Sequence, residues 1–306
     1  MYDVISIGAA TVDIFVKSTA FTLDNNKLSI TYSSKYEMSD SLICSGGGAT
    51  NSSVALSRLG LHTSCVSLLG NDPLSLFIFN DLKNNNVNTD SLIHLNKEDT
   101  DYSVILVGPD GGRTIITNRG QSRLEKDLIK WDKLADTEWF YITSLEGNLD
   151  LLEQIIGFAK EHQIKVALNP GNREIGDAKR LIPLIQFIDF FLLNGVESEM
   201  LTGIHVNEGN FWETLLSYGA KVSAVTNGRQ GAYVLTSEEK LYSPIINTTP
   251  VDETGAGDSF GSAFVGGIIN HFSAADSLFW AIKNSASVVS RIGAKTGLLT
   301  FAEIKQ

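Results

Sequence analysis

The chain has 306 residues, of which 43% are hydrophobic and 19% charged, and its formal net charge at pH 7 is −11. This length and composition favour a soluble globular chain with a sizeable core and exclude a disordered or fibrous one. The acidic balance argues against nucleic acid or an anionic membrane surface as a partner, because like charges repel.

Other general features point to the cytoplasm. The two cysteines, Cys44 and Cys65, have no CxxC spacing, and the five histidines are scattered, so no zinc site is expected. The opening "MYDVISIGAATVDIFV" lacks the basic start of a signal peptide, and no apolar run is long enough to span a membrane. We therefore expect a cytoplasmic protein whose thiols are reduced.

The first 120 residues mix core-like and exposed segments. "YDVISIGAATVDIFV" predicts a buried strand, a turn at Gly8 and a second extended piece. Residues 14–43 are polar, and the alternation in "KLSITYSSKYEM" predicts exposed β-structure. The glycine run at 46–48 precedes a predicted helix, and a strand and a helix with Pro73 near its first turn follow. "DYSVILVGPDGGRTIITN" then predicts a hairpin.

From about residue 122 onward, short apolar strands alternate with helices. The strands are "WFYITSLEGN", "KVALNPGN", "DFFLLNGVES" and "KVSAVTNGRQG", and helices are predicted over 149–161, 177–187, 208–219, 257–271 and 274–292. Such alternation predicts βαβ units around a mostly parallel sheet. We expect one α/β domain over residues 1–306, with insertions near 14–43 and 99–118. Paired as a small β-sheet, these insertions would form a lid over the strand ends where ligands bind in such folds.

The stretch "DETGAGDSFGSAF", residues 252–264, has the residues of an anion site. A glycine-rich turn entering a helix presents free N–H groups, and the helix dipole favours negative charge there. Asp258 at the helix start can accept a proton, or it can simply cap the helix. The stretch matches neither the P-loop nor the dinucleotide fingerprint. Taken alone, it leaves a phosphate site and a capped helix equally open.

Two further features suit a polyol. In "GGGATN", residues 46–51, glycines allow close approach of a ligand, and Asn51 can both donate and accept hydrogen bonds. Asp13, five residues after Gly8, can accept from two sugar hydroxyls. A tight loop and an exposed turn residue explain the same features without a ligand.

Together these motifs resemble a known family. "GGGATNSSVALSRLG" and "DETGAGDSFGSAF" resemble the two signatures of the PfkB carbohydrate kinases, the ribokinase-like family, in the right order and about 200 residues apart. The hairpin "PDGGRTI" and the segment "LLNGVESE" are similar to that family as well, so the resemblance covers essentially the whole chain. It implies a ribokinase-like fold and an ATP-dependent carbohydrate kinase that uses Mg²⁺.

The resemblance also implies roles for individual residues. Asp258 would be the general base, beside an anion hole made by the amides of Gly255, Ala256 and Gly257. The implied sugar-binding set is Asp13, Gly46, Gly47, Asn51 and Glu146. The implied nucleotide set is Asn194, Glu197, Thr226, Gly228 and Asn284, with Glu197 organising Mg²⁺ through water.

The match has departures and open points. Glu253 stands where a threonine is common, and the spacing from Asn284 to Gly293 is one residue short of the usual pattern. Asp252 and Thr254 are the analogues of a monovalent-cation site that would hold K⁺, but Lys295 in the neighbouring loop argues against it. No Walker lysine is present, so amides and Mg²⁺ would neutralise the phosphates, helped by Arg119 from the lid side.

The acceptor is not fixed by these motifs. A small sugar such as ribose or fructose is the leading prediction, and a nucleoside is the alternative, its base held by tyrosines at 32, 36 and 102. A sugar acid or phosphosugar would need a basic clamp from arginines at 113, 119 and 123, and Gly48, where many relatives have lysine, disfavours a phosphosugar. A catalytically silent sugar-binding regulator is disfavoured because Asp258 is present. Exposed lid edges would favour a homodimer.

Overall fold

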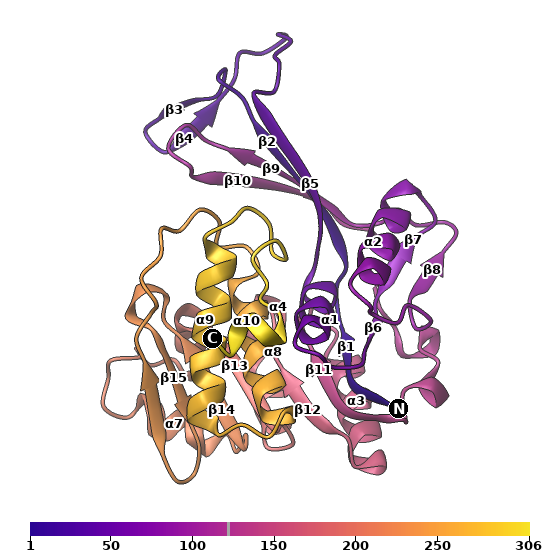
Figure 1. Cartoon of the computed structure of the whole chain (residues 1–306), viewed down its shortest axis with the longest axis vertical. Coiled ribbons are helices and arrows are strands. Elements are labelled where there is room, and N and C mark those ends of the chain that lie inside the picture. The colour runs from indigo at the N-terminus through magenta and orange to yellow at the C-terminus, as the bar shows by residue number, and fades with distance from the viewer. Residues whose placement is uncertain (121–122) are drawn as a thin grey trace.

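A mostly parallel sheet forms the centre of the protein. The computed structural model describes residues 1–120 and 123–306. Within these residues the main sheet has eight strands in the order β16-β15-β14-β13-β12-β11-β1-β6 (Figure 1). The parallel strands are β1 (Tyr2–Ile7), β6 (Thr63–Val66), β11 (Thr137–Ile142), β12 (Lys165–Leu168), β13 (Phe190–Asn194) and β14 (Val222–Thr226). At one end of the sheet, β15 (Ala232–Leu235) pairs antiparallel with β14 and with the edge strand β16 (Lys240–Ser243), which the sequence pattern did not indicate.

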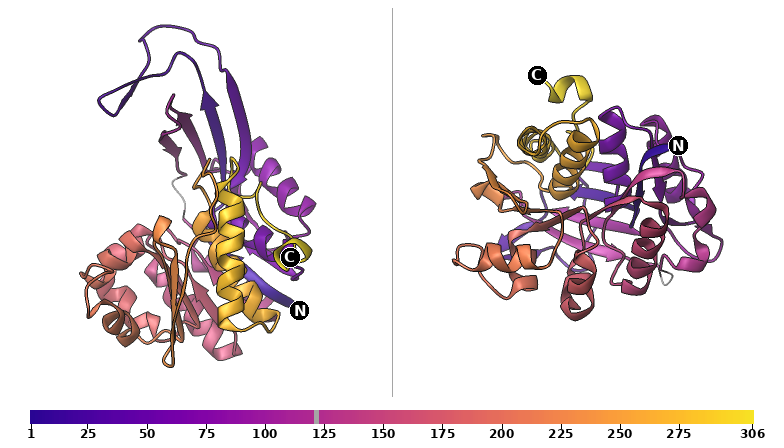
Figure 2. Two further views of the ribbon diagram at one scale, coloured as in Figure 1. Left: turned by 60° about the vertical axis from the view of Figure 1, so that its left-hand side comes forward. Right: turned by 90° about the horizontal axis from the view of Figure 1, so that it is seen from below.

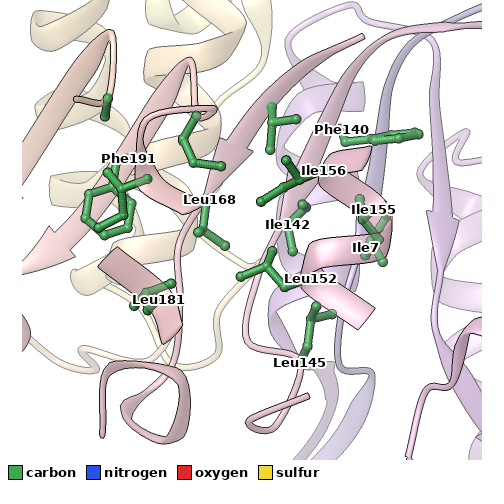
Figure 3. Close-up of a cluster of buried hydrophobic side chains, with 14 of the residues drawn as sticks. Ile7, Phe140, Ile142, Leu145, Leu152, Ile155, Ile156, Leu168, Leu181 and Phe191 are labelled. Carbon is green, nitrogen blue, oxygen red and sulfur yellow. The ribbon is translucent and has the colours of Figure 1, made fainter. Parts of the chain in front are cut away.

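Helices cover both faces of this sheet (Figure 2). They are α1 (Gly48–Arg58), α2 (Pro73–Asn84), α3 (Leu149–His162), α4 (Asn172–Gly176), α5 (Ala178–Ile185), α6 (Gly195–Thr202), α7 (Phe211–Ser217), α8 (Ala256–Ile269), α9 (Ala274–Val289) and α10 (Phe301–Ile304). Alternate residues of β11 face opposite layers, as the two-residue period of a strand requires. Phe140 packs with the helix layer of α3, whereas Tyr141 packs with that of α8 and α9. Figure 3 shows the first of these clusters.

A second, smaller sheet stands apart from the main one, and we call it the lid sheet. Its order in the described residues is β10-β9-β2-β5, from β2 (Thr11–Lys17), β5 (Asp40–Gly46), β9 (Tyr102–Val107) and β10 (Arg113–Asn118). β9 and β10 form the predicted hairpin, and β2 pairs with β9 in parallel and with β5 antiparallel. Figure 1 shows the lid sheet extending from one end of the main sheet. The predicted fold class, a parallel α/β core with a small β-sheet, is confirmed.

The prediction of β-structure through 14–43 was wrong in part. β3 (Thr22–Asp24) and β4 (Lys27–Ser29) pair only with each other, and residues 30–39 form no strand. These residues are almost all exposed, so their alternation has no core to face. Short elements complete the chain: β7 (Leu68–Gly70), β8 (Ile93–Leu95), and 3₁₀ turns at Lys126–Leu128, Trp131–Lys133 and Gly228–Gln230. The single-domain assignment stays a prediction.

Candidate active site

The glycine turn before α8 is a sharp entry into a helix. Gly255 has φ of 75° and lies against Ala294, so that a Cβ at this position would come within 2.4 Å of the Ala294 side chain. Only glycine combines this backbone conformation with so close a contact. α8 begins at the next residue, and N–H groups in the first turn of a helix have no acceptor within the helix. The Ala256 amide already donates to the Glu253 carbonyl, at 3.2 Å.

Asp258 lies in the first turn of α8 and is partly buried beside α1. Its Oδ2 accepts a hydrogen bond of 2.8 Å from Asn51 Nδ2. Burial raises the pKa of the Asp258 carboxyl, while the Asn51 hydrogen bond and the positive charge of Lys295 act in the opposite direction. A partly buried carboxylate with a raised pKa is suited to accept a proton near neutral pH.

The residues predicted to bind sugar gather where the lid sheet meets α1. Asp13 is 8% exposed in β2, and a Cβ at Gly46 would lie 2.2 Å from its Oδ2, so the two are in direct contact. Burial raises the pKa of the Asp13 carboxyl, and a hydrogen bond from Ser103 opposes this. Gly47 is the N-cap of α1, and Asn51 Oδ1 is buried without a hydrogen-bond partner among the described residues. A buried acceptor left open in this way is suited to a ligand hydroxyl.

Glu146 lines an open hollow that adjoins this site: its lining includes Ala9 and Ala10, which lie against Gly47, but not Asp13, Asn51 or Asp258. Its other lining residues are Gly8, Ala9, Ala10, Ser67, Leu68, Leu69, Glu98, Asp99, Asp101, Gly120, Leu124, Ser144 and Leu145. Arg119 Nη1 lies 3.1 Å from an Asp101 oxygen and 3.8 Å from a Glu146 oxygen. The guanidinium is therefore already paired with carboxylates. The ionisable side chains that line the hollow are all acidic, and the other lining residues are apolar, serine or glycine.

On the predicted nucleotide side, Asn194 and Glu197 form a capping box at the start of α6. Asn194 Oδ1 accepts from the Glu197 amide at 2.9 Å, and Glu197 Oε2 accepts from the Asn194 amide at 2.8 Å. Burial raises the pKa of the Glu197 carboxyl, and the negative charge of Asp258 raises it further, so the two carboxylates interact electrostatically. Thr226 ends β14 directly beside Asn194, and Gly228 begins the following 3₁₀ turn.

Asn284 has a structural role in the interior. Its Nδ2 donates to the Ser259 carbonyl and its Oδ1 accepts from the Leu299 amide, both at 2.9 Å. The side chain thus ties α9 to α8 and to the segment before α10. Both polar atoms are engaged within the protein, which leaves the predicted contact with adenine without support.

Asp252 and Thr254 do not fit a monovalent cation. The Asp252 carboxylate is 1% exposed and already accepts from the Arg113 guanidinium, from the Thr254 amide at 2.7 Å and from the Gly293 amide at 2.8 Å. Lys295, which the sequence suggested as the competing charge, points elsewhere. Its Nζ donates to Thr50 at 2.8 Å and to Asp81 at 3.0 Å.

Known proteins of similar sequence and structure identify the family. A model of the pfkB family carbohydrate kinases matches residues 2–300. The chain belongs to this family. A ribokinase of Staphylococcus aureus is 26% identical over 99% of this chain and 98% of its own. The structure of an Arabidopsis thaliana ribokinase complexed with ribose and ATP superposes with a TM-score of 0.82 at 20% identity, covering 99% of this chain and 97% of that one. An adenosine kinase of Sinorhizobium meliloti gives 0.81 at 23% identity, covering 98% and 97%.

Membership of the pfkB family confirms the predicted family and enzyme class, a carbohydrate kinase. The residue roles within the site stay predictions. Sequence reasoning missed Tyr141, a buried side chain of β11 whose hydroxyl lies against Gly261 in α8. In the described part of the chain, no helix is long and apolar enough to cross a membrane.

Proposed function

We propose that this pfkB-family kinase transfers the γ-phosphoryl group of ATP to a hydroxyl of a small ribose- or fructose-like sugar, with Asp258 as the general base. The observation that carries the proposal is the partly buried hydrogen bond from Asn51 to Asp258, 2.8 Å long. It joins the two motifs that resemble the family's signatures, one on the sugar side and one on the phosphate side. ATP is supported by the ribokinase complex with ribose and ATP, whose fold this chain shares.

The chemistry follows from the positions of these groups. An acceptor hydroxyl beside Asp13 and Asn51 would lie within reach of the Asp258 carboxylate, which takes up its proton as the new P–O bond forms. The backbone amides of Gly255 and Gly257, together with the dipole of α8, would stabilise the charge on the transferring phosphoryl group, whereas the Ala256 amide would first have to leave the Glu253 carbonyl.

The donor oxygens present fit a magnesium ion that is bound mainly by phosphates. Among the described residues no group of three or more acidic, histidine or cysteine side chains could hold a metal ion. Mg²⁺ in kinases keeps waters and phosphate oxygens as ligands and needs only one or two carboxylates. Glu197, whose carboxyl pKa is raised mainly by burial and in part by the negative charge of Asp258, is the residue that would hold the ion through water, and the ion would neutralise phosphate charge.

The charges around the hollow bear on the alternatives. A sugar acid or phosphosugar needs unpaired cations, yet Arg113 is bound to Asp252 and Arg119 to Asp101. A nucleoside kinase has support in the shared fold of the adenosine kinase. The tyrosines suggested for binding a nucleoside base give this alternative less support, because Tyr32 is 93% exposed and Tyr102 packs against the core cluster of α1 and α2. An uncharged or amine-bearing sugar suits the acidic hollow better than an anion.

A screen for acceptor-dependent ADP release tests this function. Purified protein with MgATP is given pentoses, hexoses, amino sugars, nucleosides, sugar acids and phosphosugars, one class at a time. We expect ADP release with a neutral or amine-bearing sugar and its loss in Asp258→Asn. Ser52→Ala is a matched control, because Ser52 is buried in the same helix as Asn51 but bonds only to helix carbonyls. Turnover with nucleosides alone would replace the sugar proposal, and equal ADP release with and without every acceptor would refute both.

A further inference from the structure

An ion pair joins the lid sheet to the glycine turn. Arg113 begins β10, the edge strand of the lid sheet, and its guanidinium contacts the Asp252 carboxylate. A second guanidinium nitrogen donates to the Val251 carbonyl at 2.8 Å, and the first lies 3.4 Å from Thr254 Oγ1. The Asp252 side chain is 1% exposed and that of Arg113 20%, so this is a largely buried contact between two parts of the chain that are 139 residues apart.

The contacts of Asp252 leave no place for a second cation. Both carboxylate oxygens are occupied, one by Arg113 and the Thr254 amide and the other by the Gly293 amide. The single negative charge is balanced by the single guanidinium. A K⁺ ion bound to the same carboxylate would lie a few ångströms from the guanidinium in a buried site, where two positive charges repel strongly.

These contacts also fix the shape of the turn. Asp252 bridges the turn to Gly293 in the loop after α9, and Gly255 packs against Ala294 in that same loop. The planar guanidinium donates to the Asp252 carboxylate and, at the same time, to the Val251 carbonyl. A spherical ion or a lysine ammonium would bridge these two groups less specifically. Displacement of this turn would move the amides at the start of α8.

We propose that Arg113 takes the place of a monovalent cation in this kinase. It is a positioning residue that holds the turn from Asp252 to Gly255, and with it the anion site, without K⁺. Because Arg113 comes from the lid sheet, the anion site is fixed only while β10 lies against the turn, so the position of the lid and the order of the anion site are coupled. This rests on the proposed role of the glycine turn in binding phosphate.

The first test measures kcat for the wild-type protein in KCl and in tetramethylammonium chloride at equal ionic strength. We expect equal values. In Arg113→Ala we expect kcat to fall about 10- to 100-fold in tetramethylammonium, less than the roughly 10²–10³ lost with a whole anion-hole donor, and to recover in part in KCl. Arg113→Lys should retain more activity and show no response to K⁺. Lys17→Ala is the control, since it removes an exposed cation from the same sheet, and it should behave as wild type.

The second test needs no acceptor. The Tm of Arg113→Ala should rise in KCl relative to tetramethylammonium chloride, because the vacated Asp252 can now bind the ion, whereas the Tm of wild type should not. Activation of the wild-type protein by K⁺ overturns the proposal. So does an Arg113→Ala protein that has lost activity and whose kcat and Tm are both the same in KCl and in tetramethylammonium chloride. If Arg113→Ala does not fold, a K⁺ response of Arg113→Lys equally overturns it. If the acceptor screen fails, the Tm comparison still decides this point.

Discussion

The hydrogen bond from Asn51 to Asp258 offers the sharpest test of the catalytic assignment. Asn51→Ala removes a bond of 2.8 Å to a partly buried carboxylate, and alanine is well tolerated inside a helix such as α1. Hydrogen bonds to charged groups are worth about 1.5–3 kcal/mol, which corresponds to a loss of roughly 10- to 150-fold in kcat/KM. The free energy of unfolding should change less, because the substitution also removes Asn51 Oδ1, a buried acceptor with no partner among the described residues.

The pH profile distinguishes this effect from simple damage. The Asn51 bond lowers the pKa of Asp258 against the effect of burial, so its loss raises that pKa further. We therefore expect the acidic limb of kcat/KM in Asn51→Ala to move to higher pH than in wild type. Steady-state rates measured across pH, with Ser52→Ala as the control, check this. An acidic limb that stays in place, or one that moves equally in Ser52→Ala, would show that Asp258 is not the titrating base.

Three further outcomes are expected. Asp258→Asn should lower kcat about 10²–10⁴-fold. Burial raises the folded-state pKa of Asp258 above its unfolded value of 3.8, so the stability that this carboxyl contributes is full below pH 3.8 and is lost as pH rises through the folded-state pKa. Asp258→Asn should therefore raise the Tm at pH 8, and its Tm should approach that of the wild type near pH 4. Lys295→Met, judged by urea unfolding, should cost about 2–3 kcal/mol, below the usual cost of breaking a buried pair because Asp81 is 30% exposed. The apolar side chains of Ile43 and Ile116 are 53% and 58% exposed on the lid sheet and favour a homodimer there; Ile43→Asp should then give a monomeric mass by light scattering, and a monomeric wild type would exclude that dimer.

The sequence supported much of the fold because its patterns are local. The alternating strands and helices after residue 122, the hairpin at 102–118 and the helix after the glycine run all have periodicities that their neighbours do not override. The segment 30–39 has the same alternation but no strand beside it, and alternation without a pairing partner does not make a strand. The antiparallel pairing of β15 and β16 was missed because strand direction depends on long-range pairing.

The site was predicted unevenly for a related reason. Asn51 and Asp258 are 207 residues apart, and only the order of the two motifs indicated that they meet. No comparable motif in the sequence indicates which residues the charged side chains pair with. Arg113 and Lys295 were both considered as ligand contacts or competitors, yet Arg113 pairs with Asp252 and Lys295 with Asp81. A single sequence shows the charges but not which opposite charge each one meets in the folded chain.

The lid sheet thus contributes to both halves of the proposed reaction. Through Asp13 in β2 it supplies a carboxylate to the acceptor side, and through Arg113 in β10 it holds the turn on the phosphate side. Both residues lie on strands of one hydrogen-bonded sheet, separated only by β9, so movement of the sheet would shift both together. An acceptor that binds Asp13 and draws the sheet inward would then also stabilise the anion site. Phosphoryl transfer to water in the absence of acceptor would be disfavoured by this coupling, since the anion site is completed only when the lid sheet is in place.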